Sequence, residues 1–76
     1  MIIKETFATA FRNHQGNNFK KAENLYKKIL KIDPNHLESI FLLGSLSVQT
    51  KSFDRAIQLF NKVIAIRPNH VNAYHN

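Results

Sequence analysis

The chain has 76 residues, of which 43% are apolar, and it contains six Phe but only two Gly and two Pro. This composition excludes a disordered chain and a loop-rich β fold, and the length allows one small domain. The absence of Cys excludes disulfides and Cys-bound metals, while a net charge of +6 permits contact with nucleic acid or an anionic membrane without establishing it.

The first half of the chain predicts two helices joined by a short turn. Apolar residues recur at helical spacing in residues 2–15 and again in residues 19–32. Residues 16–18 between them tolerate a bend, and Asn18 is a typical N-cap residue. Pro34 ends the second helix, because proline lacks an amide donor and disfavours helix in the residue before it.

The second half repeats this order. Helices are expected over residues 37–49 and 53–66, joined by a turn at residues 50–52 in which Ser52 is the N-cap candidate. Pro68 ends the last helix. The two halves therefore share both their periodicity and their helix-ending residues.

The halves are two copies of one unit, offset by 34 residues. The sequence Asp-Pro-Asn-His at residues 33–36 returns as Arg-Pro-Asn-His at residues 67–70. The same offset relates the pairs Phe19/Phe53, Ala22/Ala56 and Leu25/Leu59. A helical hairpin of this length cannot bury its apolar face alone, so the repeat predicts an all-α fold in which antiparallel helix-turn-helix units stack.

These features resemble tetratricopeptide (TPR) repeats, which have a 34-residue period, an aromatic residue three before an Ala, a second aromatic residue and a closing Pro. Leu43-Gly44 stands where that family has its Leu-Gly pair. The resemblance implies one TPR-like domain over residues 1–76, stacked as a short right-handed superhelical solenoid. Its parts would be repeat one (3–36), repeat two (37–70) and a partial third repeat or capping turn (71–76).

The first helix departs from the family pattern. It has Thr6, Thr9 and Ala10 where the family has a large aromatic residue, Leu and Gly. The sequence leaves open whether this segment is a capping helix or packs in a shifted register.

The resemblance implies a non-catalytic scaffold, because TPR arrays hold peptide or helical segments of partner proteins in a groove lined by the first helix of each repeat. The groove positions of the family fall here on Lys4, Phe7, Phe11, His14, Gln15, Glu38, Phe41, Ser45, Val48, Gln49, Asn72 and His75. Members that clamp a C-terminal carboxylate have Lys and Asn in place of Phe7 and Phe11, so an apolar or amphipathic ligand is expected. Phe7, Phe11 and Phe41 are equally compatible with a place in the core.

The last helix has an apolar face that a third repeat would cover, and the sequence contains only the start of such a repeat. We expect self-association, most simply as a symmetric homodimer, through Ile57, Phe60, Ile64 and Tyr74. A second interpretation makes the chain the N-terminal TPR segment of a longer protein, because His14-Gln15 and Leu25-Tyr26 resemble bacterial TPR arrays that precede a glycosyltransferase-like domain.

Other kinds of chemistry have weaker support. The five lysines of residues 19–32 fall within roughly a 120° arc, but no aromatic residue or Arg accompanies them, so nucleic-acid binding is not favoured over a solvated helix face. The four His lack a completing acid or Cys at metal-ligand spacing, and the five acidic residues are scattered. We therefore assign no metal, no cofactor and no catalytic residue.

We expect a cytoplasmic protein that is not embedded in a membrane. The chain starts without the apolar segment of a signal peptide, and its longest apolar runs, such as residues 40–43, are too short to cross a bilayer. Small secreted domains also usually need disulfides, which a chain without Cys does not form.

Overall fold

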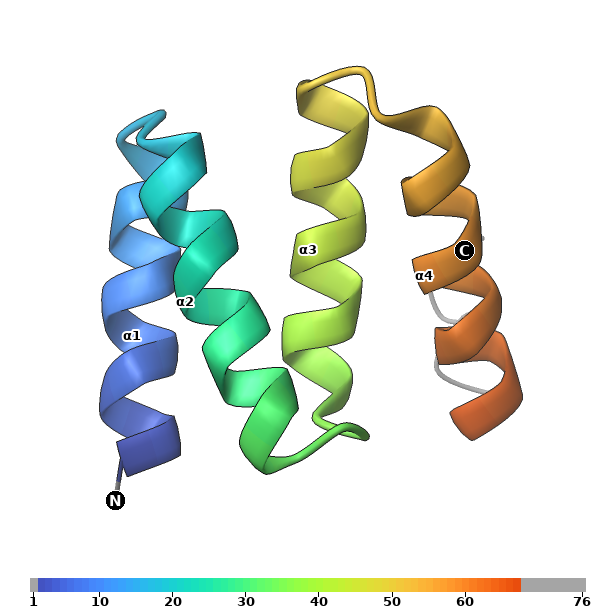
Figure 1. Cartoon of the computed structure of the whole chain (residues 1–76), viewed down its shortest axis with the longest axis horizontal. Helices are drawn as coiled ribbons and strands as arrows, with labels where there is room; N and C mark the ends of the chain where they lie inside the picture. Colours follow the sequence, from blue (N-terminus) through green and yellow to red (C-terminus); the bar gives the residue numbers. More distant parts are fainter. Residues whose placement is uncertain (1, 68–76) are drawn as a thin grey trace.

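The computed structural model describes residues 2–67 and folds them into four helices, with no strand in this range (Figure 1). The helices are α1 (Ile2–Gln15), α2 (Phe19–Ile32), α3 (Leu37–Gln49) and α4 (Phe53–Ile66). Each has the bounds expected from the sequence, and the all-α prediction is confirmed. Residue 1 and residues 68–76, which include the expected partial third repeat, lie outside the described range.

The helices lie side by side in chain order, and successive helices run in opposite directions (Figure 1). α1 packs against α2, α2 against α3, and α3 against α4. The pairs α1–α2 and α3–α4 are the two expected helix-turn-helix units. α1 and α4 therefore form the two ends of the described array.

The main core cluster lies where α1, α2 and α3 meet. Its members are Ala10, Ala22, Tyr26, Leu43 and Leu46, which are at most 3% exposed. Larger apolar side chains from all four helices pack around this cluster. Because α2 contributes to both of its neighbours, it holds the two repeats against each other.

Small residues let the paired helices approach closely. Gly44 of α3 faces the ring of Phe60 in α4, and a Cβ atom on Gly44 would lie 2.7 Å from Cε1 of that ring. Ala10 stands 34 residues earlier, in α1, and is fully buried. α1 therefore packs on α2 in the register that α3 has on α4, with Thr6 and Thr9 partly exposed. This geometry favours a capping helix over a shifted register.

The turns after α1 and α3 have the same backbone geometry. Asn17 and Lys51 have φ angles of 64° and 65°, in the left-handed region. The Lys51 amide donates to the Val48 carbonyl at 3.0 Å, and the Ser52 amide donates to the Ser47 carbonyl at 2.7 Å. Equivalent bonds close the turn after α1. Both helices thus end in a Schellman motif.

The helix caps differ in part from expectation. Asn18 and Ser52 occupy the N-cap positions of α2 and α4, but neither side chain makes a capping hydrogen bond. Their conformation is set by the preceding turn, which uses their amides to close the previous helix. His36 caps α3 with its side chain, since Nδ1 accepts from the Ser39 amide at 3.3 Å and lies 2.7 Å from the Ser39 hydroxyl.

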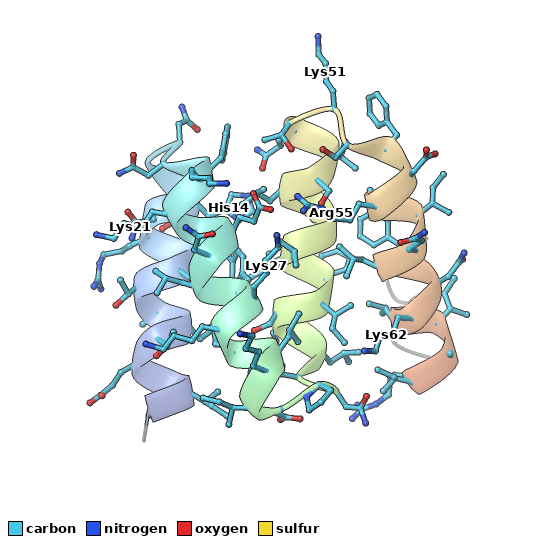
Figure 2. The ribbon with its side chains drawn as sticks, viewed as in Figure 1. His14, Lys21, Lys27, Lys51, Arg55 and Lys62 are labelled. Carbon is cyan, nitrogen blue, oxygen red and sulfur yellow. The ribbon has the colours of Figure 1, made fainter. Side chains whose placement is uncertain are left out.

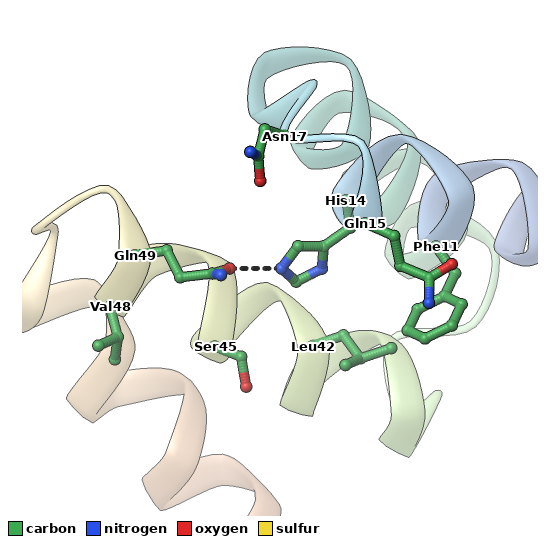
Figure 3. Close-up of a pocket in the computed structure, with 8 residues that line it drawn as sticks. All are labelled: Phe11, His14, Gln15, Asn17, Leu42, Ser45, Val48 and Gln49. Atoms are coloured by element: carbon green, nitrogen blue, oxygen red, sulfur yellow. Dashed lines mark hydrogen bonds between the residues drawn. The ribbon is translucent and has the colours of Figure 1, made fainter.

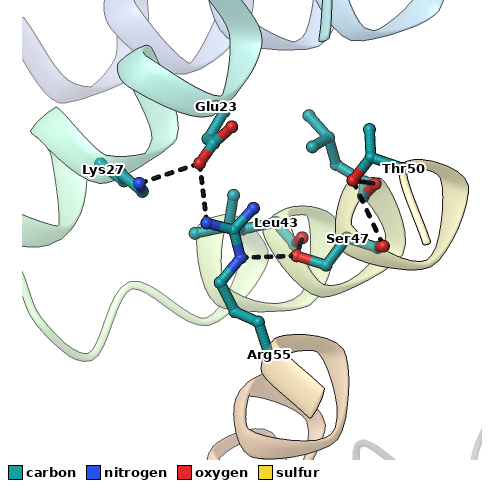
Figure 4. A network of polar contacts seen from close by, with 7 residues as sticks. Glu23, Lys27, Leu43, Ser47, Thr50 and Arg55 are labelled. Carbon is teal, nitrogen blue, oxygen red and sulfur yellow. Dashed lines mark hydrogen bonds and ion pairs between the residues drawn. The ribbon is translucent and has the colours of Figure 1, made fainter. Parts of the chain in front are cut away.

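A polar network fixes the two repeats relative to each other (Figure 4). The Glu23 carboxylate of α2 accepts from Arg55 Nη1 of α4 at 2.7 Å and pairs with Lys27 Nζ at 2.8 Å. Arg55 Nε also donates to Ser47 Oγ of α3 at 3.1 Å. Hydrogen bonds from Lys27, and then from Arg55, lower the pKa of Glu23 from 4.5 to about 2. One arginine thereby links three helices.

Removal of backbone strain at Lys51 should stabilise the fold. The Lys51 side chain is exposed and projects from the turn (Figure 2), so its removal costs few contacts. A residue with a Cβ atom in the left-handed conformation loses roughly 1 kcal/mol of stability. Lys51→Gly is therefore expected to raise the free energy of unfolding by about 0.5–1 kcal/mol, measured by urea denaturation. Lys51→Ala keeps the Cβ atom and should give no such gain. An equal gain from both variants would contradict strain as the cause.

Acid should remove the contribution of Glu23 to the free energy of unfolding over a defined range of pH. Because the pKa of Glu23 is lowered on folding, its contribution is complete above its usual value of 4.5 and is lost as the pH falls toward 2. The difference in unfolding free energy between the wild-type chain and Glu23→Gln is expected to shrink over this range, measured by urea denaturation at a series of pH values. A difference that stays constant over the range would show that the ion pairs do not stabilise the fold.

Candidate functional site

A pocket of about 550 Å³ lies between α1 and α3 (Figure 3). Its lining residues are Phe11, His14 and Gln15 of α1, Asn17 of the following turn, and Leu42, Ser45, Val48 and Gln49 of α3. No acid, Lys or Arg is among these eight residues. The pocket is therefore an uncharged site built by the first helices of two consecutive repeats.

Helix geometry explains why these residues meet. Phe11, His14 and Gln15 are three and four residues apart and so share one side of α1. Ser45 and Gln49 share one side of α3 in the same way. α2 packs against both α1 and α3. The chain reverses direction at the turn before α2 and again at the turn after it, so α1 and α3 run parallel and end at the same edge of the molecule (Figure 1).

His14 connects the two walls of the pocket. Its Nε2 lies 2.6 Å from Oε1 of Gln49, and its Nδ1 lies 3.1 Å from the Tyr26 hydroxyl. His14 is only 9% exposed. A neutral imidazole that donates from Nε2 to Gln49 and accepts the Tyr26 hydroxyl at Nδ1 satisfies all three groups. This chain of hydrogen bonds joins α2, α1 and α3.

Tyr26 holds the network from the core. It is fully buried, and burial raises the pKa of its hydroxyl from 10.0 to about 12. The His14 ring lies 5.9 Å from the Tyr26 ring, with an angle of 76° between their planes. It lies 6.0 Å from the Phe19 ring, with an angle of 81°. These edge-on contacts fix the orientation of the imidazole at the pocket.

The pocket brings together half of the expected groove residues. These are Phe11, His14, Gln15, Ser45, Val48 and Gln49, and their role in binding stays a prediction. The structure adds Leu42 and Asn17, which the groove pattern omits. The spacing of Leu42, three residues before Ser45, is a signal for the same helix side. Asn17 joins the lining through its left-handed turn, which the sequence pattern does not specify.

The three Phe residues that were compatible with either the core or the groove differ in their surroundings. Phe7 lies at the margin of the core, with its ring 6.1 Å from that of Tyr26. Phe11 is 41% exposed and lines the pocket. Phe41 is half-buried, with its ring 5.6 Å from that of Phe60 in α4.

Two further groove candidates lie away from the pocket. Lys4 and Glu38 are exposed near the starts of α1 and α3 and do not line it. Asn72 and His75 fall outside the described residues.

The expected self-association residues of α4 form one apolar row. Ile57 and Ile64 are 57% and 44% exposed. Phe60 is half-buried because it packs against α3 of its own repeat. Phe53, which was not expected here, extends the row and is 55% exposed. Its position four residues before Ile57 is the signal that could have identified it. Tyr74 lies outside the described residues.

The described residues were also compared with the requirements of a metal site, a membrane span and a basic surface. Within residues 2–67, no group of three or more His, Cys, Asp and Glu side chains is placed to hold a metal ion. No helix there is both long and apolar enough to cross a membrane. The lysines of α2 are exposed, and Lys27 is already paired with Glu23.

Comparison with models of protein families matches residues 14–76 to the tetratricopeptide repeat. The chain belongs to the tetratricopeptide repeat family. The matched range is most of the chain, and the TPR helix pairs agree with the packing described above. Comparison with curated proteins finds no match. TPR domains are in general protein-interaction modules and are typically non-catalytic.

Removal of the Tyr26 hydroxyl should destabilise the fold by leaving a buried acceptor unpaired. Tyr26→Phe is expected to lower the free energy of unfolding by about 1–3 kcal/mol, measured by urea denaturation, because His14 Nδ1 loses its donor. The ring itself is retained, and repeat two already has Phe60 at this position. Gln49→Leu acts on the same imidazole, so the double variant is expected to be non-additive. Additive losses would show that the three groups do not form one network.

Proposed function

We propose that the chain is a cytoplasmic, non-catalytic scaffold that binds a peptide segment of a partner protein between α1 and α3 and self-associates through α4. The observation that carries the proposal is the pocket, because it lies on the first helices of two stacked repeats and is lined by eight uncharged residues. TPR membership supports the same class of function.

The lining favours a peptide with an apolar side chain and few charges. Phe11, Leu42 and Val48 offer apolar surface, and Gln15 and Gln49 offer side-chain amides. Amides both donate and accept, so they match the N–H and C=O groups of a peptide backbone. A charged ligand group would lose water without meeting an opposite charge in this lining.

Self-association is supported by the exposed row on α4. Three of its four residues, Phe53, Ile57 and Ile64, are more than two fifths exposed. An apolar row of this kind on a helix is typical of a protein-interaction surface.

The alternative that these residues begin a longer, glycosyltransferase-like protein involves the same module, and catalysis would then belong to another domain. Nucleic-acid binding through the α2 lysines gains no specific support from the structure. Neither alternative changes the role proposed for the pocket.

Filling the pocket should weaken peptide binding. Peptides selected by the full chain from a displayed random library are expected to have an uncharged, apolar centre. Ser45→Arg places a long charged side chain in the lining and should weaken their binding roughly tenfold or more, measured by fluorescence anisotropy. Lys28→Ser, on the lysine-rich side of α2, is the control and should bind as the wild-type chain does.

Two results would contradict the proposed site. Selected peptides that bind Ser45→Arg as well as they bind the wild-type chain would place the ligand elsewhere. A selection of acidic peptides, with binding lost only in Lys28→Ser, would assign the activity to the lysines of α2.

A further inference from the structure

The apolar row of α4, named the α4 stripe, consists of Phe53, Ile57, Phe60 and Ile64. Their spacings of four, three and four residues follow the alternation of a coiled-coil seam. Phe60 forms the half-buried floor of the stripe, and the other three side chains are between 44% and 57% exposed. α4 has 14 residues, which corresponds to about 21 Å. The stripe therefore fits one helix of similar length.

The equivalent positions of α2 show how such a row is covered within the array. Phe19, Glu23, Tyr26 and Leu30 stand 34 residues before the members of the α4 stripe, and α3 packs against α2. Tyr26 is fully buried, whereas its counterpart Phe60 is only half-buried. Coverage by a neighbouring helix accounts for this difference.

One position differs in chemistry as well as in exposure. Glu23 of α2 pairs with Arg55 and so fixes the following repeat. The counterpart of Glu23 in α4 is Ile57. The α4 stripe therefore lacks the acid that orients a following repeat on α2. It offers instead an uninterrupted apolar seam.

The opposite end of the molecule cannot cover this seam well. Glu5, Thr9 and Arg12 of α1 are the counterparts of Ser39, Leu43 and Leu46 of α3, which are all buried. The Thr9 hydroxyl donates to the Glu5 carbonyl at 3.1 Å and accepts from Arg12 Nη2 at 3.4 Å. Exposed Glu5 and Arg12 would lose water against an apolar helix without gaining a partner. Head-to-tail stacking of copies is therefore disfavoured.

We propose that a second copy of this chain covers the α4 stripe, with the two α4 helices antiparallel across a two-fold axis. This inference rests on the self-association in the proposed function and adds its geometry. The antiparallel seam places Phe53 opposite Ile64 of the second copy and Ile57 opposite its Phe60. Each stripe is used once, so the assembly closes at two copies.

Electrostatics favour the antiparallel direction. In an antiparallel pair, the partly positive N-terminus of each helix lies beside the partly negative C-terminus of the other, which is favourable. In a parallel pair, like ends lie side by side and repel each other. Asp54 lies in the first turn of α4, and Arg67 directly follows the last turn. Antiparallel pairing brings Asp54 of one helix toward Arg67 of the other. The stripe itself carries no charge, so the net charge of +6 on each copy lies outside the seam.

Sedimentation of the full chain over a range of concentrations tests the pairing. The wild-type mass is expected to rise from monomer and level off at dimer. Ile57→Glu gives α4 the residue that α2 has at this position and should weaken dimerisation roughly tenfold or more, because the carboxylate would be desolvated in the seam. Gln58→Glu makes the same change of charge at an exposed position off the stripe and should dimerise as the wild-type chain does.

Cross-linking tests the direction, because the chain contains no Cys. Phe53→Cys and Ile64→Cys chains, mixed in equal amounts and oxidised, are expected to yield mainly the mixed disulfide, identified by mass spectrometry. In an antiparallel pair, two Cys at position 64 lie too far apart to bond. A parallel pair would give mainly the like-with-like disulfides and would overturn the proposed orientation.

The outcomes separate this inference from the proposed function. A mass that grows beyond dimer, or a dimer that persists in Ile57→Glu, overturns the closed pair while leaving self-association in place. A monomer at every concentration overturns both self-association and the pair. Peptide binding to the pocket is measured separately and decides the other half of the proposed function.

Discussion

The close contact between the two helices of each repeat is the constraint on which the remaining structure depends. Gly44 has no side chain, so the ring of Phe60 occupies the space that a Cβ atom would need. Repeat one achieves the same approach with Ala10, which is fully buried. Because each pair is tight, α2 can contact α1 and α3 at once and align the sides of these helices that line the pocket. Helix pairing therefore places the pocket. Its lining residues determine which ligands fit it.

The helices were predictable because each boundary has a local cause. In the sequence, a proline stands two residues after the last residue of α2 and of α4, and residues that tolerate bends follow α1 and α3. The burial of a large residue was not predictable from the helical period alone. Phe7 and Phe11 share one side of α1, and their rings stack 6.5 Å apart at 5°. Phe7 nevertheless packs toward Tyr26, whereas Phe11 is exposed at the pocket. His36, whose ring lies 5.5 Å from that of Phe7, helps to cover it from the start of α3. That neighbour is distant in sequence, so the helical period of α1 alone carries no sign of it.

The polar links between repeats were also missed, although the sequence holds a signal for them. His14 bonds to Gln49 across 35 residues, and Glu23 bonds to Arg55 across 32. Both separations lie close to the 34-residue period, as stacking of consecutive repeats requires. Pairs of polar residues about one period apart are numerous in the chain, and the period alone does not select among them. Packing makes the selection, because only groups on facing sides of neighbouring helices come within hydrogen-bonding distance.

The pocket and the α4 stripe occupy different helices, and this separation has a consequence for binding. All pocket-lining residues come from α1, α3 and the turn after α1, whereas the stripe lies on α4. A closed pair formed through α4 would thus leave both pockets open and would carry two of them at a fixed distance. Once one segment of a partner has bound one pocket, a second suitable segment of the same partner would be held at a raised effective concentration near the other pocket. Two repeats form a small groove, and pairing offers a way to increase affinity without lengthening the array.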